Sequence, residues 1–163
     1  MAITYEAIQT TTLGAAAAGI TFGSIASSWT DLRLIVTGTT AVFTDTVRFQ
    51  FNGDTGTNYS LTRLTGNGSA ASSTRATSSP QGNLIFACSD TIPCMGTLDI
   101  FSYAGSTYKT TLNTSSTDQN GSGRTDSIVT LWQNTAAITS IYIFGSGNLN
   151  SGTTATLYGI LAA

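Results

Sequence analysis

The stretch TVRFQFNGDTGTNYSLTRL, residues 46–64, decides the fold class, because two alternating segments flank a run of turn residues. Val47, Phe49 and Phe51 share one face of the first segment and polar residues occupy the other, a period of two that is typical of a half-buried strand. The same alternation recurs in LRLIVT, TLDIFSY and ITSIYIF, with Gly-, Asn- and Pro-containing turns between such segments. About ten short strands at this spacing predict an all-β protein, either a sandwich or a barrel.

The composition supports the same fold class. Thr, which favours strands, occurs 31 times, while Ser and Gly, which favour turns, occur 19 and 17 times. A chain of 163 residues predicts a single domain, which we assign to residues 1–163. Charged residues make up only 9%, against about 25% in an ordinary soluble domain. A surface with so little charge is best tolerated where few molecules compete to aggregate or where neighbouring molecules cover it, and we interpret it as a hint of assembly.

The ionisable residues exclude several classes of function. The chain has no His, which removes Ser-His-Asp and Cys-His catalysis and every imidazole metal site. Its one Glu lies in the first predicted strand and its seven Asp lie beside turns or at outward strand positions, so we expect a non-enzymatic protein without a cofactor. The six basic residues are scattered singly, which argues against nucleic-acid binding.

The sequence carries no membrane signal. No apolar run reaches the length of a membrane span. The start, MAITYEAIQTTTLGAAAAG, lacks the basic region that begins a signal peptide. We therefore expect synthesis in a cytoplasm and no association with a membrane.

The segment FNGDTGTNYS, residues 51–60, allows two interpretations. Asn52, Asp54 and Asn58 offer oxygen atoms at even spacing, as a calcium loop does, but an EF-hand would need more carboxylates and flanking helices. We favour a structural turn in which Asn52 and Gly53 adopt positive φ and Asp54 caps nearby N–H groups. The turn would form a hairpin-like connection that brings Phe51 against a Tyr on the adjacent strand, with no bound metal.

Cys88 and Cys94 enclose the short segment SDTIP. A disulfide across so small a loop would stabilise the fold by roughly 2 kcal/mol. Cytoplasmic synthesis disfavours that pairing, so the preferred interpretation is two buried thiols beside a Pro-containing turn, with the disulfide left open.

Three further segments carry expectations about the surface. Residues 66–82 and 116–124 contain little that could be buried and are expected to be surface loops. In the strand 138–144, Ile141 and Ile143 alternate with Tyr142 and Phe144, so one pair cannot enter the core and is a candidate interface. Residues 1–12 are expected to extend from the sandwich as an arm.

A family resemblance rests on four stretches of this sequence. These are SIASSWTDLRLIVTG, VRFQFNGDTGTNYSLTRLTGNGSAASS, YAGSTYKT and LWQNTAAITSIYIF with TATLYGI. Together they resemble a family of small virion proteins of tailed bacteriophages, in one collinear match over nearly the whole chain. The resemblance implies a jelly-roll-type β-sandwich that serves as a capsid decoration protein or as a tail-fibre domain. It transfers no catalytic motif and no role for the two cysteines.

The expected function is that of a capsid decoration, or cement, protein in the virion, made in the host cytoplasm. It would act as a homotrimer and stabilise the head by binding between subunits of the major capsid protein. The alternative is a receptor- or carbohydrate-binding module of the tail, because jelly rolls also serve as lectins. Its candidate sugar contacts are Trp29 beside Asp31, Tyr103 or Tyr108, and Trp132, which we interpret as a core residue.

Overall fold

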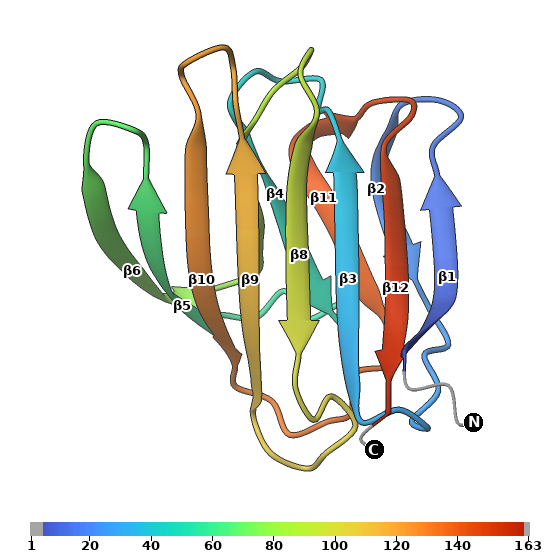
Figure 1. Ribbon diagram of the computed structural model, residues 1–163. Helices are drawn as coiled ribbons and strands as arrows, with labels where there is room; N and C mark the ends of the chain where they lie inside the picture. Colours follow the sequence, from blue (N-terminus) through green and yellow to red (C-terminus); the bar gives the residue numbers. More distant parts are fainter. Residues whose placement is uncertain (1–4, 162–163) are drawn as a thin grey trace.

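The computed structural model describes residues 5–161, which form two antiparallel β-sheets packed face to face (Figure 1). Within that range the strands are β1 (Tyr5–Thr12), β2 (Ala17–Phe22), β3 (Asp31–Gly38), β4 (Asp45–Phe51), β5 (Tyr59–Gly66), β6 (Ala71–Ser79), β7 (Gly82–Cys88), β8 (Cys94–Ile100), β9 (Lys109–Thr117), β10 (Arg124–Trp132), β11 (Ile141–Leu149) and β12 (Thr154–Ile160). The described residues include no helix that could cross a membrane.

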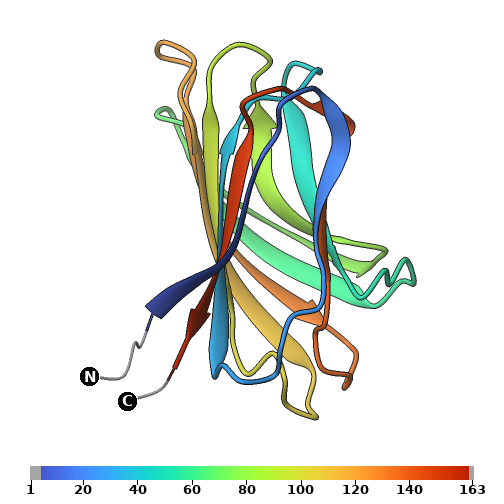
Figure 2. The same cartoon turned by 90° about the vertical axis from the view of Figure 1, so that its right-hand side faces the viewer.

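The two sheets differ in width. One contains eight strands in the order β1-β12-β3-β8-β9-β10-β5-β6, and the other contains four in the order β2-β11-β4-β7. Figure 2 shows the two layers from the side, and Figure 1 shows β5 and β6 extending past the narrower sheet at the left. The expected antiparallel, jelly-roll-like β-sandwich is confirmed. The eight-stranded sheet therefore leaves part of its inner face uncovered.

The core lies where the narrow sheet covers the wide one. In β4 burial alternates strictly, and Val47, Phe49 and Phe51 are all at most 2% exposed. They face the inward residues of β3 and β8, among them Leu34 and Leu98, which have no exposed surface. Burial of each side chain of this kind contributes about 1.5–3 kcal/mol to the stability of the fold. The apolar residues that alternate along these strands therefore hold the two sheets together.

Strand β9 reverses the usual polarity of a half-buried strand. Its inward positions are polar, including Lys109 and Asn113, whereas Leu112 points outward and is 40% exposed. Lys109 Nζ donates to the carbonyl oxygens of Gly105 at 2.7 Å and Thr107 at 2.5 Å, and burial lowers the pKa of Lys109. Buried amines and amides are tolerated because they find such partners. Hydrophobicity alone would have assigned the wrong face of β9 to the core.

The turn after β4 is a crossover between the sheets, so the expected hairpin-like connection is wrong. β4 pairs with β11 and β7, while β5 pairs with β10 and β6 in the other sheet. Phe51 and Tyr59 do meet, with ring centroids 6.3 Å apart, but they meet across the sandwich and not on adjacent strands. Apolar residues on both sides of the turn are buried in the core. Because the turn crosses between the sheets, one sheet contributes Phe51 and the other contributes Tyr59.

The segment 66–82 is not a loop, because most of it forms β6. This strand pairs with β5 along its length and forms one edge of the wide sheet. Nearly all its residues are exposed, so it carries no apolar alternation for sequence analysis to detect. A strand with both faces exposed to solvent can be built from Thr and Ser residues. In the other predicted loop, 116–124, residues 118–123 connect β9 to β10.

The expected N-terminal arm is also wrong for the described residues. β1 pairs with β12 in the wide sheet, from Tyr5 opposite Ile160 to Thr12 opposite Thr154. The ring of Tyr5 stacks on Tyr158 at 4.7 Å, and Thr12 and Thr154 share a hydrogen bond. An edge position leaves β1 mostly exposed, which explains why its sequence lacks a clear apolar face. Residues 1–4 of the predicted arm lie outside the described residues.

Candidate functional site

The turn residues 52–58 bind other parts of the same chain. Asn52, with φ 53°, accepts hydrogen bonds from the N–H groups of Thr139 and Ser140, and Gly53 follows with φ 66°. The carboxylate of Asp54 accepts from Gly56 N at 2.9 Å, from Asn58 Nδ2 at 2.9 Å and from Trp132 Nε1 at 2.7 Å. Burial raises the pKa of Asp54, but these hydrogen bonds outweigh it and hold the pKa below its ordinary value. The carboxylate is thereby committed to protein donors.

Cys88 and Cys94 form a disulfide, so the preferred interpretation of two thiols is wrong. They are the last residue of β7 and the first of β8, with Cα atoms 5.4 Å apart, a separation that a disulfide spans readily. Both cysteines are at most 3% exposed and pack in the core. The bond closes the loop 89–93 at its base. Cys88 ends a strand of the narrow sheet and Cys94 begins a strand of the wide sheet, so the disulfide links the two sheets where the chain crosses between them.

Replacing both cysteines, Cys88→Ser with Cys94→Ser, is expected to lower the free energy of unfolding by roughly 2 kcal/mol while the chain still folds. The loop is short and the core around it is large, so the cross-link removes little entropy from the unfolded chain. Urea denaturation of the wild type with and without dithiothreitol measures the same quantity. The double variant should not respond to the reductant, and failure of that variant to fold would contradict this account.

Large apolar side chains gather on two loops at one end of the sandwich, the upper end in Figure 1. Val42 and Phe43 between β3 and β4 are 44% and 57% exposed, and Ile92 between β7 and β8 is 39% exposed. We call these three residues the apolar end. A hydrogen bond from Thr40 N to Ser89 O joins the two loops, and the disulfide closes the second one. We take the apolar end as the candidate interaction site because its exposed apolar residues lie on two loops that are joined to each other.

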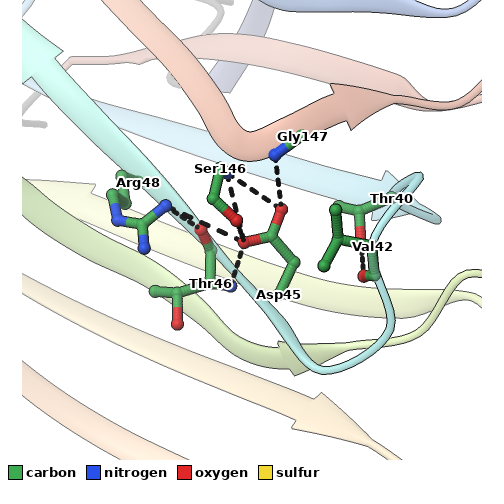
Figure 3. A network of polar contacts seen from close by, with 7 residues as sticks. All are labelled: Thr40, Val42, Asp45, Thr46, Arg48, Ser146 and Gly147. Carbon is green, nitrogen blue, oxygen red and sulfur yellow. Dashed lines mark hydrogen bonds and ion pairs between the residues drawn. The ribbon is translucent and has the colours of Figure 1, made fainter.

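The buried carboxylate of Asp45 joins the start of β4, after the loop that carries Val42, to β11 (Figure 3). Asp45, 3% exposed, accepts hydrogen bonds from Ser146 Oγ at 2.6 Å, Ser146 N at 3.0 Å, Gly147 N at 3.3 Å and Thr46 N at 2.7 Å. Arg48 lies 3.8 Å away as its ion-pair partner. Val42 packs against Gly147, where an added Cβ would approach it to 2.6 Å. The irregular part of β11 is thus fixed to the loop that presents Val42 and Phe43.

The expected interface strand contributes residues to both faces of the narrow sheet. Ile141 and Ile143 have no exposed surface, whereas Tyr142 and Phe144 point outward and stack with centroids 4.9 Å apart. Tyr142 also covers Gly19 of β2 and donates to Ala18 O at 3.4 Å. The outward pair is therefore partly covered by its own sheet, and both of its residues are half-buried.

The residues expected to contact sugar have structural partners. The half-buried Trp29 lies on Gly159, and Asp31 Oδ1 accepts from Ser102 N at 2.7 Å. Tyr103 has no exposed surface, and its hydroxyl donates to the carbonyl of Ala26. Trp132 is also fully buried, which confirms that it is a core residue. Tyr108 is exposed, at 55%.

A second cluster lies on the inner face of β5 and β10, beneath the edge strand β7 of the narrow sheet. Asp126 of β10, 2% exposed, accepts two hydrogen bonds from Arg124, of 2.6 and 2.9 Å. Thr65 Oγ1 donates to it at 2.6 Å and Ser115 Oγ at 3.4 Å. Arg63 of β5 lies beside this group, with its guanidinium 3.9 Å above the ring of Phe86. Two cations therefore share one carboxylate.

Sequence analysis missed the apolar end and this cluster. Val42 and Phe43 lie in the polar connection TTAVFTD, where adjacent bulky residues outside an alternating pattern were a usable signal. Arg124 and Asp126 are two residues apart on one strand and therefore share a face, which the sequence does indicate. Arg63 joins them only through the pairing of β5 with β10. Among residues 5–161, no group of three or more His, Cys, Asp or Glu could hold a metal ion.

Comparisons with known proteins give similar folds only. No protein-family model matches the chain, and no curated protein does. Caenorhabditis elegans galectin LEC-6 is similar over 91% of this chain and 94% of that chain, with 12% sequence identity and a TM-score of 0.40. Domains LG4-5 of the mouse laminin alpha1 chain are similar over 94% of this chain and 42% of that chain, with 13% identity and a TM-score of 0.35. Likenesses of this degree say nothing about what the chain binds.

Proposed function

We propose that this protein is a non-enzymatic structural component of a tailed-bacteriophage virion, and that it acts as a decoration protein on the head. The observation that carries the proposal is the apolar end, where Val42, Phe43 and Ile92 are exposed on braced loops. The sequence resemblance supplies the virion setting. The partner is the major capsid protein, which would offer an apolar pocket where its subunits meet.

The mechanism is mechanical and depends on the stiffness of the loops. A loop that is already ordered loses little entropy on binding, so more of the apolar burial becomes affinity. Burying one large apolar side chain contributes about 1.5–3 kcal/mol, so three of them supply several kcal/mol per copy. Each bound copy adds contact area that must separate before the shell can open, and the effect multiplies over the copies on a head.

We propose a homotrimer as the binding unit, because capsid sites have local symmetry and closed rings match it. The half-buried pair Tyr142 and Phe144 is the subunit contact that this arrangement would use. Sedimentation of the purified protein measures the oligomer, and a monomer at the concentration needed for head binding would contradict the trimer.

The proposal is tested by replacing Phe43 and measuring occupancy on undecorated heads. Phe43→Ser is expected to weaken binding roughly thirtyfold, which corresponds to about 2 kcal/mol of lost apolar burial. Leu64→Ser is the matched control, since Leu64 is 57% exposed as Phe43 is but lies on the outer face of β5. The control should bind like the wild type.

Location in the virion separates this proposal from the tail-module alternative. Copies distributed over the head, in a fixed ratio to the major capsid protein, would support decoration. Protein found only at the tail tip, or a Phe43→Ser variant that occupies heads as fully as the wild type, would overturn it. Heads carrying Phe43→Ser protein should also release their genome at a lower temperature than heads carrying the control.

A further inference from the structure

We propose that Arg63 anchors a binding site for the carboxylate of an acidic sugar, on the inner face of β5 and β6. The inference does not depend on docking at the apolar end, and it holds for either place in the virion. It begins from an imbalance of charge: Arg63 and Arg124 face the single carboxylate of Asp126. The cluster of Arg63, Arg124 and Asp126 therefore carries one net positive charge.

Asp126 does not accept a hydrogen bond from Arg63, because its carboxylate oxygens already accept hydrogen bonds from other residues. Arg124 binds both of them, and Thr65 and Ser115 add one hydrogen bond each. Arg63 Nε stays 3.7 Å from Asp126 Oδ1, is inaccessible to solvent, and makes no hydrogen bond. Its guanidinium is held instead against Phe86, which fixes its plane. Among residues 5–161 no acceptor takes any of its N–H groups.

Repulsion between the two arginines favours the binding of an anion at this cluster. Burial lowers the pKa of Arg63, and repulsion from Arg124 lowers it further, while Asp126 opposes both effects. Arginine stays protonated regardless, so this repulsion is a free-energy cost that an anion relieves. A planar carboxylate matches the fork of a guanidinium in a two-point hydrogen bond.

The surroundings of Arg63 specify a sugar as the carrier of that carboxylate. On β6, Thr74 pairs with Arg63 and Ser72 pairs with Thr65, so their side chains share the inner face. Both are exposed, because the narrow sheet ends at β7 and does not cover β6. The anion would therefore meet hydroxyl groups on the β6 side and the ring of Phe86, over which Arg63 lies, on the other. Hydroxyl-rich ligands suit such a surface, and the uncovered edge of the sheet leaves room for a longer saccharide.

The test is titration of the full chain with D-glucuronate and D-galacturonate, followed by amide chemical shifts in NMR. We expect saturable shifts in β5, β6 and β7 with one or both uronates, and none with neutral galactose. Arg63→Gln should weaken uronate binding at least tenfold, and Arg63→Lys should not restore it, because an ammonium group lacks the planar fork. Arg75→Gln is the matched control: it removes the same charge from β6, but Arg75 pairs with Thr62 on the outer face.

A second variant keeps the test valid even if changes at Arg63 disturb folding. Thr74→Glu changes only an exposed residue and places a carboxylate beside Arg63, so it should abolish uronate binding without lowering the melting temperature. N-acetylglutamate amide distinguishes a protein source of the carboxylate. Tighter binding of that compound than of the uronates would overturn the assignment to a sugar. Absence of saturable shifts with both uronates, or equal affinity in wild type and Arg63→Gln, would overturn the site itself.

Discussion

Trp132→Ala is expected to lower the free energy of unfolding by about 4 kcal/mol, as truncation of a large buried aromatic residue does. The side chain has no exposed surface, and its ring centroid lies 5.4 Å from that of Phe51 and 6.4 Å from that of Tyr59. These neighbours come from both sheets, so the variant leaves a cavity between the layers. It also removes the N–H group that binds Asp54. Urea denaturation at neutral pH measures the loss.

Two companion variants separate packing from hydrogen bonding at this position. Trp132→Phe keeps an aromatic ring but leaves Asp54 without its indole donor, so its effect should fall between those of the wild type and Trp132→Ala. Val129→Ala truncates a residue of the same strand that is 46% exposed, and it should cost less than about 0.5 kcal/mol. If Trp132→Ala cost no more than Val129→Ala, the contact between the layers would not depend on this residue.

Asp45→Ala is expected to lower the free energy of unfolding by about 3 kcal/mol, because it leaves buried donors without an acceptor. The N–H groups of Ser146 and Gly147 would lose their partner, and Arg48 would lose its counterion. Asp45→Asn should cost nearly as much, since an amide offers one acceptor atom where two are used. Asp118→Ala, in the exposed loop before β10, removes the same charge and should change the unfolding free energy by less than about 0.5 kcal/mol.

The contribution of Asp45 should also depend on pH in a defined direction. Burial raises the pKa of Asp45, but the hydrogen bonds from Ser146, Gly147 and Thr46 outweigh burial and hold it below its ordinary value of 3.8. A carboxyl group whose pKa is lower in the folded protein stabilises it above the unfolded value, and that stability is lost as the pH falls through the folded value. The difference between wild type and Asp45→Asn should therefore be constant near neutral pH and shrink below pH 3.8. A difference that grows in acid would contradict the assignment.

The sequence predicts this fold well wherever one face of a strand packs on the other sheet. β4 and β3 alternate in sequence as they alternate in burial, so their existence and orientation can be read directly. β6 packs on nothing, and its Ser and Thr residues look like a loop until pairing with β5 is known. The crossover after Phe51 is equally invisible, because a turn between strands of one sheet and a turn between two sheets use the same residues.

The candidate sites are less predictable, because they depend on pairing over long distances. Arg63 and Asp126 meet only because β5 and β10 are neighbours, with Arg63 opposite Ile128. Cys88 and Cys94 are near in sequence, yet compartment arguments favoured thiols over the bond that the β7–β8 loop allows. In the sequence Asp45 is one of several acidic residues beside a turn, and only the approach of β11 shows that its carboxylate is a buried acceptor.

The order of strands in the two sheets has a consequence for how the protein is made. Of the twelve described strands, β1 and β2 leave the ribosome before the others, but β1 pairs only with β12 and β2 only with β11, the two that follow all the others. The backbone groups of β1 and β2 find native partners only after almost the whole sandwich has been synthesised, and β3 and β4 wait as long for one of their two partners. Contacts this distant in sequence slow folding and prolong the exposure of unpaired edges. We expect the nascent chain to remain unfolded until β12 emerges, which protease sensitivity of stalled chains would reveal.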